Sequence, residues 1–240
     1  MYLQITTHCN MSCPHCVFAC SAEKKGDFMT LATLRRAIEH AEYRDAYVTI
    51  GGGEPTLHPK FWQFFAEIMA SDIEHVFMAT NGSVTRTAKT LAHLASTDAD
   101  SKFSCALSQD WYHDPIDEEV YYLFEKRGLE IRDVGENISD NGSARINNLS
   151  THDRCGCSEI FIAPTGEVRM CGCDDALVLG DLDALNDNAL MERAYSYHYE
   201  KDCGSLRKME DWEVQWVLYG TEDGDTNYPS EMPKDLACAA

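Results

Sequence analysis

Three cysteines lie close together near the start of the chain, in the run Cys9-Asn-Met-Ser-Cys13-Pro-His-Cys16. Soft thiolate ligands select iron–sulfur centres and zinc over hard cations. A loop this short can give one sulfur to each of three irons of a cubane cluster. The fourth iron then has no ligand from the loop and is free to bind another molecule. The spacing therefore predicts an open-site iron–sulfur cluster.

Three other interpretations of the cysteine loop stay open. Zinc sites favour two separated cysteine pairs, whereas these three cysteines have gaps of three and two residues. An electron-transfer cluster would need a fourth thiol such as Cys20. Ferredoxin runs have gaps of two, two and three residues followed by proline, but Ser21 follows Cys20 here. The third alternative is a set of buried thiols without a metal.

A glycine-rich turn, Gly51-Gly-Gly-Glu54-Pro55, is the second group that points to chemistry. Consecutive glycines remove every Cβ where the backbone must bend and approach a ligand closely. Pro55 then fixes the direction in which the chain leaves the turn. On its own, such a turn is also typical of an ordinary strand end.

The elements that must position these groups alternate between strands and helices. Apolar residues at helical spacing follow Thr30, a suitable N-cap, and the other helices show similar patterns. No helix can be placed between Gly135 and Arg154, and Thr165-Gly166 predicts a turn into residues 167–170. Strands are expected at 2–7, 47–50, 75–80, 103–108, 129–134 and 159–163, and helices at 31–43, 59–69, 85–94 and 117–126.

This alternation requires parallel strand pairing with right-handed crossovers. Five or six such units are too few for a closed eight-stranded barrel. The expected fold class is therefore α/β, a partial, open (β/α)6-type TIM barrel with its site at the carboxyl ends of the strands. Residues 1–164 would form this core, and residues 165–240 a C-terminal extension, with a cysteine hairpin, packed on it.

Taken together, the two motifs resemble the radical S-adenosylmethionine (radical SAM) superfamily. The C-x3-C-x2-C loop resembles the signature of that superfamily, and Gly52-Gly53-Glu54-Pro55 resembles its GGE motif. Thr80-Asn81-Gly82, after the third strand, is a further similarity. The resemblance covers roughly the first 135 residues. It implies reductive cleavage of S-adenosylmethionine (SAM) at a 4Fe-4S cluster, giving a 5′-deoxyadenosyl radical that abstracts hydrogen from a substrate.

The resemblance also implies roles for individual residues. Cys9, Cys13 and Cys16 would hold the 4Fe-4S cluster, and its open iron would bind the amino and carboxylate groups of SAM. Alternatives from the residues themselves are an exposed loop position for His15 and a turn or N-cap role for Asn81 or Asp110. The implied SAM contacts are Gly52, Gly53 and Glu54 to the amino group, His15 to the adenine, Ser108 and Asp110 to the ribose, and Asn81.

A second cysteine group, Cys155, Cys157, Cys171 and Cys173, flanks the sixth strand and the turn after it. It resembles a reduced form of the SPASM and Twitch extensions, which implies an auxiliary iron–sulfur cluster. Four thiols on two arms of a hairpin can also hold zinc. Unligated thiols are a third interpretation, since only Cys203 and Cys238 remain downstream.

The composition sets limits on the class of protein. The 240 residues carry a formal charge of −20, which disfavours generic nucleic-acid binding. The apolar runs are too short to span a membrane, and no secretory signal is visible. Eleven cysteines without an export signal favour metal ligation over disulfides. We therefore expect a cytoplasmic location.

The leading hypothesis is a radical SAM enzyme that acts on a peptide or protein. Alternatives are an enzyme of this superfamily that modifies a small molecule or nucleotide and, in a different class, a non-catalytic electron-transfer or metal-binding module. The superfamily's chemistry implies an external one-electron donor of the flavodoxin or ferredoxin type. Because the cysteine loop begins at residue 9, we expect a separate recognition protein to present any peptide substrate.

Overall fold

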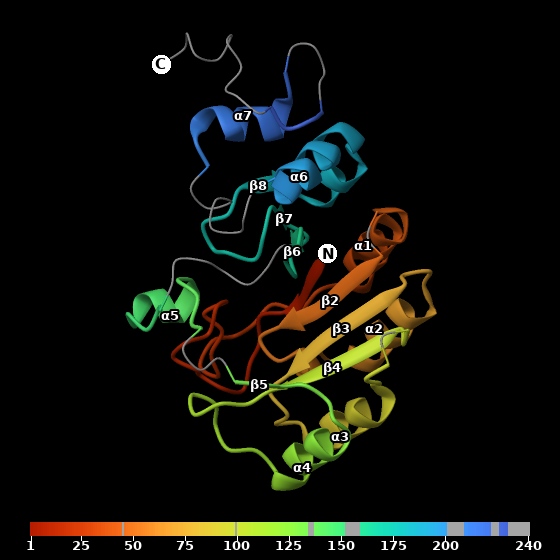
Figure 1. Ribbon diagram of the computed structural model, residues 1–240, viewed down its shortest axis with the longest axis vertical. Coiled ribbons are helices and arrows are strands. Elements are labelled where there is room, and N and C mark those ends of the chain that lie inside the picture. The colour runs from red at the N-terminus through yellow and green to blue at the C-terminus, as the bar shows by residue number, and fades with distance from the viewer. Residues whose placement is uncertain are drawn as a thin grey trace.

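The structure is a computed structural model that describes residues 1–44, 46–98, 100–133, 137–151, 159–200, 209–221 and 226–229. Its strands form one eight-stranded sheet in the order β5-β4-β3-β2-β1-β6-β7-β8. Neighbouring strands from β1 to β5 pair in parallel, and Figure 1 shows them side by side. The parallel strands are β1 (Tyr2–Thr6), β2 (Tyr47–Gly52), β3 (His75–Thr80), β4 (Phe103–Ser108) and β5 (Ile131–Arg132).

Four helices connect these strands: α1 (Leu31–Arg44), α2 (Phe61–Ala70), α3 (Thr85–Leu94) and α4 (Glu118–Lys126). Local capping explains two of their starts. The Thr33 amide donates to Thr30 Oγ1 at 3.1 Å before α1, and the Glu119 amide donates to Asp117 Oδ1 at 2.9 Å before α4. Five parallel strands joined by four helices form an open sheet, which confirms the open, partial barrel expected from the sequence.

The strands alternate between a face that packs on the helices and a face that is open. In β3, Val76 and Met78 are fully buried in the main hydrophobic core, whereas His75, Phe77 and Ala79 line a cavity. This alternation follows from the two-residue period of a strand. One face of the sheet thus stabilises the fold, and the other lines the cavity.

The sixth strand does not extend the series beyond β5. β6 (Phe161–Ile162) pairs in parallel with β1, on the opposite side of the sheet, and then continues into antiparallel β7 (Val168–Arg169) and β8 (Val178–Gly180). Strand–helix alternation does not specify which edge receives a late strand. The remaining elements are two short 3-10 helices, η1 (Pro55–Leu57) and η2 (Leu182–Asn186), and helices α6 (Asn188–Glu200) and α7 (Asp211–Tyr219).

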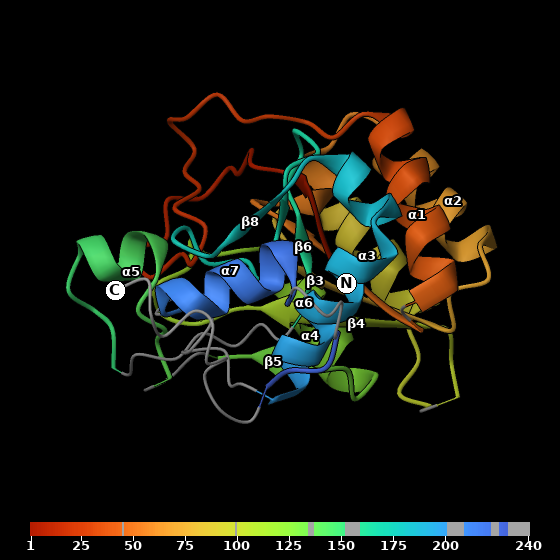
Figure 2. The same cartoon turned by 90° about the horizontal axis from the view of Figure 1, so that it is seen from above.

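One expectation was wrong: the segment 135–154, in which no helix could be placed, contains α5 (Gly142–Ile146). This helix has only five residues, too few for a hydrophobic period. Figure 2 shows α5 beside the loop that follows β1, on the opposite side of the molecule from α1 and α2. In the described residues, no helix has the length and apolar character needed to cross a membrane.

Candidate active site

The loop after β1 brings the three predicted metal ligands together. Cys9 is buried, Cys13 and Cys16 are half-buried, and all three pack with Met11 and Cys20 in a small cluster of their own. The Cys16 amide donates to the carbonyl of Cys13 at 3.1 Å, which folds the loop back on itself. The Met11 amide donates to Cys9 Sγ at 3.5 Å.

Three sulfurs this close together cannot all ionise easily unless a cation is bound between them. Burial, together with the neighbouring sulfurs of Cys16 and Cys9, raises the pKa of Cys13 to about 12. Burial also raises the pKa of Cys9, whereas a hydrogen bond from Cys20 lowers the pKa of Cys16 to about 6. Three thiolates this close repel one another unless iron neutralises them. The sulfur set and its crowding therefore fit a 4Fe-4S cluster.

The glycine turn packs directly against the cysteine loop. The amides of Gly53 and Glu54 donate to the carbonyls of Thr6 and His8 at 2.8 and 2.9 Å. A Cβ at Gly53 would lie 2.3 Å from the His8 carbonyl oxygen. The missing side chain thus allows a close approach between two backbone segments.

Glu54 is a buried carboxylate at the end of β2. Its Oε1 accepts from the Thr56 amide at 3.1 Å and from Thr80 Oγ1 at 2.8 Å, and its Oε2 accepts from the Asn81 amide at 2.7 Å. Burial raises the pKa of Glu54, and the hydrogen bonds partly offset this effect. Among the residues that the structure describes, no Lys, Arg or His forms an ion pair with Glu54. A ligand ammonium group would therefore suit this position.

Asn81 connects the end of β3 to the cysteine loop. Its Nδ2 donates to Asn10 Oδ1 at 3.2 Å and lies 3.9 Å from Cys9 Sγ. Its Oδ1 accepts from the Ser83 amide at 3.0 Å, and the positive φ of this turn, 77°, belongs to Gly82. Asn81 therefore shapes the turn through its side chain rather than through its backbone angles.

His15, Asp110 and His113 form a polar group beside the cysteines. Asp110 Oδ1 contacts His113 Nδ1 at 2.8 Å, and its Oδ2 lies 3.5 Å from His15 Nε2. His15 Nδ1 and Asp110 Oδ2 are buried and accept or donate no hydrogen bond in the described part of the chain. Such orphaned buried atoms are costly unless a ligand satisfies them, which fits the polar groups of a nucleoside.

The electrostatics of this group favour a neutral His15 beside an ionised Asp110. Burial lowers the pKa of His15. Although burial opposes ionisation of Asp110, hydrogen bonds from His113 and the Tyr112 amide hold its pKa below the usual value. The ligand atoms of the three side chains also lie within 4.8 Å of one another, which is compact enough to hold a metal ion.

The sequence did not single out His113 as a cofactor contact. The available signal was its position three residues after Asp110, just beyond the end of a strand.

Asn141 is a further polar residue beside the site, in a loop that the sequence suggested could reach its mouth but to which it assigned no role. This almost fully buried side chain donates through Nδ2 to the Val17 carbonyl at 2.8 Å, and its Oδ1 accepts from the Asp174 amide at 3.2 Å. The Ser143 amide of α5 donates to the Cys16 carbonyl at 2.8 Å. α5 thus supports the cysteine loop from the side opposite the glycine turn.

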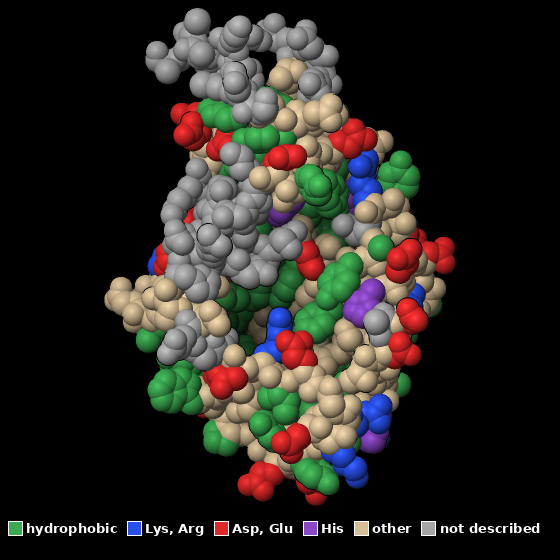
Figure 3. Space-filling view, in the orientation of Figure 1, with side chains coloured by type: hydrophobic (Ala, Val, Ile, Leu, Met, Phe, Trp, Pro, Cys, Tyr) green, Lys and Arg blue, Asp and Glu red, His purple; other side chains and the backbone are tan. Residues whose placement is uncertain are grey.

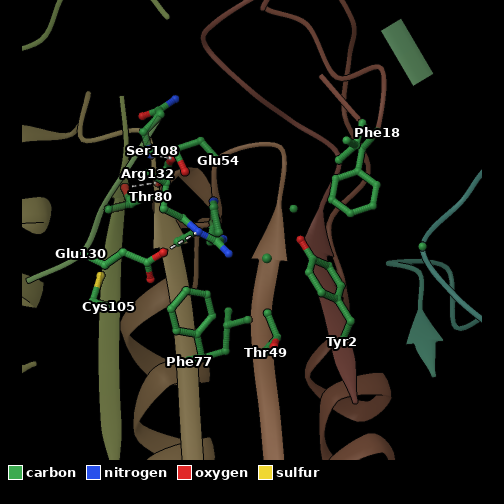
Figure 4. Close-up of a pocket in the computed structure, with 18 of the residues that line it drawn as sticks. Tyr2, Phe18, Thr49, Glu54, Phe77, Thr80, Cys105, Ser108, Glu130 and Arg132 are labelled. Atoms are coloured by element: carbon green, nitrogen blue, oxygen red, sulfur yellow. Dashed lines mark hydrogen bonds and ion pairs between the residues drawn. The ribbon is translucent and has the colours of Figure 1, made fainter. Parts of the chain in front are cut away.

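A cavity of about 1180 Å³ runs from the cysteine loop along the open face of β2 to β5. Figure 3 shows this face hollowed, and Figure 4 shows Thr49, Phe77 and Arg132 on the wall formed by the strands. Ser108 lines the same cavity at the end of β4. Ligand pockets typically measure about 300–1,000 Å³, so this one has room for a cofactor and a substrate together.

The second cysteine group is only partly described. Cys171 and Cys173 are fully buried in the turn between β7 and β8, and Gly172 between them lines the cavity. Cys155 and Cys157 lie outside the described residues.

The fold is a partial barrel, and a three-cysteine loop and a buried carboxylate lie at the ends of its strands. Residues 3–101 match the model of the Radical SAM superfamily, so the chain contains a radical SAM domain. The fold is similar to that in the solved structure of BtrN in complex with AdoMet and 2-DOIA, with a TM-score of 0.57 and 17% sequence identity. That likeness covers 87% of this chain and 85% of BtrN and shows the fold alone.

Two curated relatives match the amino-terminal part of the chain. Mycofactocin maturase MftC of Mycobacterium tuberculosis (strain CDC 1551 / Oshkosh) is 34% identical over 95 residues, 40% of this chain and 24% of MftC. GTP 3′,8-cyclase of Actinobacillus succinogenes is 38% identical over 84 residues, 33% of this chain and 25% of the cyclase. The match spans about a quarter of the length of these relatives. Both matches fall within or close to the radical SAM region of the chain.

Proposed function

We propose that the chain cleaves SAM reductively at a 4Fe-4S cluster held by Cys9, Cys13 and Cys16. When bound and reduced by an external donor, the cluster would supply one electron to break the C5′–S bond of SAM, which would release methionine and give a 5′-deoxyadenosyl radical able to abstract hydrogen from a substrate in the cavity. The observation that carries the proposal is the direct packing of the cysteine loop on the glycine turn, with the Gly53 and Glu54 amides donating to the carbonyls of Thr6 and His8. The three sulfurs and the buried carboxylate of Glu54 all line the cavity, which supports a shared site for the cluster and SAM.

The chain's own residues would position SAM and exclude water. Glu54 and the backbone of Gly52 and Gly53 would bind the SAM amino group, and Asn81 would fix the loop against β3. The orphaned atoms of His15 and Asp110 would meet the adenine and ribose, with Ser108 beside them. Such positioning is the contribution a protein makes when its cofactor carries the chemistry.

The test is anaerobic cluster reconstitution followed by dithionite and SAM. We expect the wild type to form 5′-deoxyadenosine, and the Cys13→Ala variant to form none above background. Iron and sulfide contents establish that the wild type is loaded. A loaded wild type that forms no more 5′-deoxyadenosine than Cys13→Ala would contradict the proposal.

An electron-transfer module is the second candidate function, because Cys20 packs among the cluster cysteines and hydrogen-bonds with Cys16. If Cys20 is the fourth ligand, Cys20→Ala should lose the cluster, and SAM should not change the spectrum of the reduced protein. If the fourth iron is open, Cys20→Ala keeps the cluster and its electron paramagnetic resonance signal responds to SAM. We favour the second outcome.

A second metal site at Cys155, Cys157, Cys171 and Cys173 also remains a proposal. Its test is metal analysis of a variant in which Cys9, Cys13 and Cys16 are all alanine. Remaining iron would support an auxiliary cluster, zinc would support a structural site, and a metal-free protein would contradict both.

Substrate, partners and organisation complete the proposal. The two relatives, a mycofactocin maturase and a GTP 3′,8-cyclase, are named for different substrates. The proposal therefore includes two substrate classes: a peptide or protein, and a small molecule or nucleotide. A flavodoxin- or ferredoxin-type protein would supply the electron, and a separate recognition protein would present a peptide. We also propose a cytoplasmic location and a division into a core of residues 1–164 and an extension of residues 165–240.

A further inference from the structure

Arg132 is a cationic side chain on the wall of the cavity. Among the described residues that line the cavity, no other is Lys or Arg. It ends β5, in register with Ser108 of β4, and its side chain extends across the open face of the sheet. Its guanidinium carbon lies 5.2 Å from the centre of the Phe77 ring, which belongs to β3. Figure 4 shows Arg132 above the Phe77 ring and below Glu54 in this view, with a dashed line to Glu130.

The guanidinium is held by one edge only. Arg132 Nε donates to Glu130 Oε1 at 3.2 Å. Within the part of the chain that the structure describes, its Nη1 and Nη2 atoms make no hydrogen bond. The contact with Phe77 and the bond to Glu130 together fix the plane of the group. The free edge is therefore oriented in advance, and its paired N–H groups match the two oxygens of a carboxylate or phosphate.

The neighbouring polar side chains are already engaged with protein groups. Thr49 Oγ1 donates to Glu159 Oε1 at 3.0 Å. His75 contacts Ser104 Oγ at 2.9 Å through Nε2 and the Ser101 carbonyl at 3.0 Å through Nδ1. Arg132 thus differs from them in keeping unused donors on the cavity side.

The charge around Arg132 limits what can bind to it. Glu130, Glu159 and Asp98 also line the cavity, and the whole chain carries a net charge of −20. This field disfavours polyphosphates and other highly charged anions. A single carboxylate or phosphate monoester, bound at the free edge of the guanidinium, suits these surroundings better.

We propose that Arg132 is a substrate-binding residue that holds one carboxylate or phosphate group of the substrate. The inference rests on the proposed function, because it takes the cavity as the substrate site. The anion would lie over the middle of the sheet, facing the end of the cavity where Glu54 and Ser108 lie. Anchoring the substrate there would set which of its C–H bonds faces the cofactor.

The test uses three probes of similar shape: phenylacetate, phenyl phosphate and the neutral phenylacetamide. Their binding to the cluster-loaded protein with SAM is measured by ligand-observed NMR. We expect the wild type to bind at least one anionic probe about tenfold more tightly than the amide. Arg132→Met should lose this preference, and Arg132→Lys should keep part of it. The relative affinities of the two anions distinguish a carboxylate site from a phosphate site.

Arg35→Met is the matched control, because Arg35 also pairs with a glutamate, Glu67, but on the surface of α1 and α2. It should keep the wild-type preference. The proposal is overturned if the wild type binds no anionic probe saturably, shows no preference, or keeps its preference in Arg132→Met. A protein that cleaves SAM without this preference loses only the role of Arg132. One that has the preference but forms no 5′-deoxyadenosine loses the proposed function instead.

Discussion

Glu54 illustrates how one residue can serve both the fold and a ligand. Its carboxylate accepts hydrogen bonds from three neighbours, Thr56, Thr80 and Asn81, and so joins the end of β2 to the end of β3. Burial nevertheless raises its pKa, because the bonds do not fully replace water around the charge. Without a ligand, the charged form of Glu54 is therefore a cost to stability, which a bound ammonium group would reduce.

This cost gives a pH dependence of defined sign. Because the pKa of Glu54 is raised on folding, its stabilising contribution is present below the pKa of the unfolded chain and is lost as pH rises through the folded value. The metal-free wild type should therefore lose stability relative to Glu54→Gln as pH rises, by up to about 1.4 kcal/mol per pH unit. Urea unfolding of both proteins at several pH values measures this difference.

Glu67→Gln is the control for this prediction. Glu67 is half-buried on the surface, and its hydrogen bond with Arg35 lowers its pKa, so the wild type should gain stability relative to Glu67→Gln as pH rises. Parallel pH curves for the wild type and Glu54→Gln would show that burial does not perturb Glu54.

Some residue-scale features can be predicted from the sequence, and others cannot. Cys9, Cys13 and Cys16 are local in sequence, so their spacing alone predicts that they lie close together. The contacts of Asn141 with the Val17 carbonyl and the Asp174 amide join segments far apart in the chain, and a single polar residue in a loop carries no signal of them. His15 and Asp110 were expected near the cofactor, but their contact with His113 depends on how the loop after β4 folds.

At the scale of elements, the cysteine loop is held between two short segments. The glycine turn packs on one side of it and α5 on the other. Gly142 of α5 has a φ of 53°, and a Cβ there would lie 2.4 Å from the Val17 carbonyl oxygen. Close backbone contact on both sides therefore fixes the position of the sulfurs.

Gly53→Ala tests the contact on the side of the glycine turn. The added Cβ would meet the His8 carbonyl at 2.3 Å, so the loop must shift. We expect a loss of about 1–3 kcal/mol in the free energy of unfolding and a clear loss of bound iron after gel filtration. Gly128→Ala is the comparison: its φ of 66° predicts a loss of about 1 kcal/mol, but no atom lies within 4 Å and iron content should be normal. Equal iron contents in the two variants would contradict this role for Gly53.

Asn141→Ala tests the support from α5. It leaves the Val17 carbonyl and the Asp174 amide without this partner, which should cost about 1–3 kcal/mol. The cluster should also bleach faster in air, as followed by visible absorbance. Asn147→Ala removes only an exposed bond to the Pro14 carbonyl and should change stability by about 0.5 kcal/mol or less. If both variants bleach at the same rate, the buried bond is not what protects the cluster.

Helices and strands could be predicted where their apolar residues repeat with a helical or strand period. The helices α1 and α4 and the strands β3 and β4 follow apolar patterns and end at or close to the expected residues. α5 and the two-residue strand β5 are too short for such a pattern, and contacts with other segments determine them. This is why the sequence predicted a longer strand, over 129–134, and no helix between residues 135 and 154.

At the scale of the whole molecule, the sheet joins the first strand of the chain to strands that come much later in the sequence. β1 lies between β2 and β6, so a strand near residue 161 covers one that starts at residue 2. Buried residues from β7, α6 and α7, such as Val168, Met191 and Trp216, belong to the same hydrophobic core as Leu3 and Ile5. The alternation of strands and helices indicated an open barrel but contained no information on this long-range pairing.

The shared core predicts that residues 1–164 do not form a stable protein alone. This fragment keeps β6 but lacks β7, β8 and the helices that cover this part of the core, which exposes apolar surface and an unpaired strand edge. We expect an aggregated or non-cooperatively unfolding product, as judged by gel filtration and thermal melts monitored by circular dichroism. A soluble fragment that melts cooperatively near the temperature of the full chain would contradict the prediction.

The alternation along β3 has a consequence for how this scaffold can change over time. Val76 and Met78 pack in the hydrophobic core, whereas Phe77 and Ala79, one position away, face the cavity instead. Substitutions in the second set can therefore alter which molecule is accepted with little penalty to folding. Selection could in this way explore new specificities while the first set stays unchanged, which makes the open face of the sheet the natural place to begin redesigning the protein.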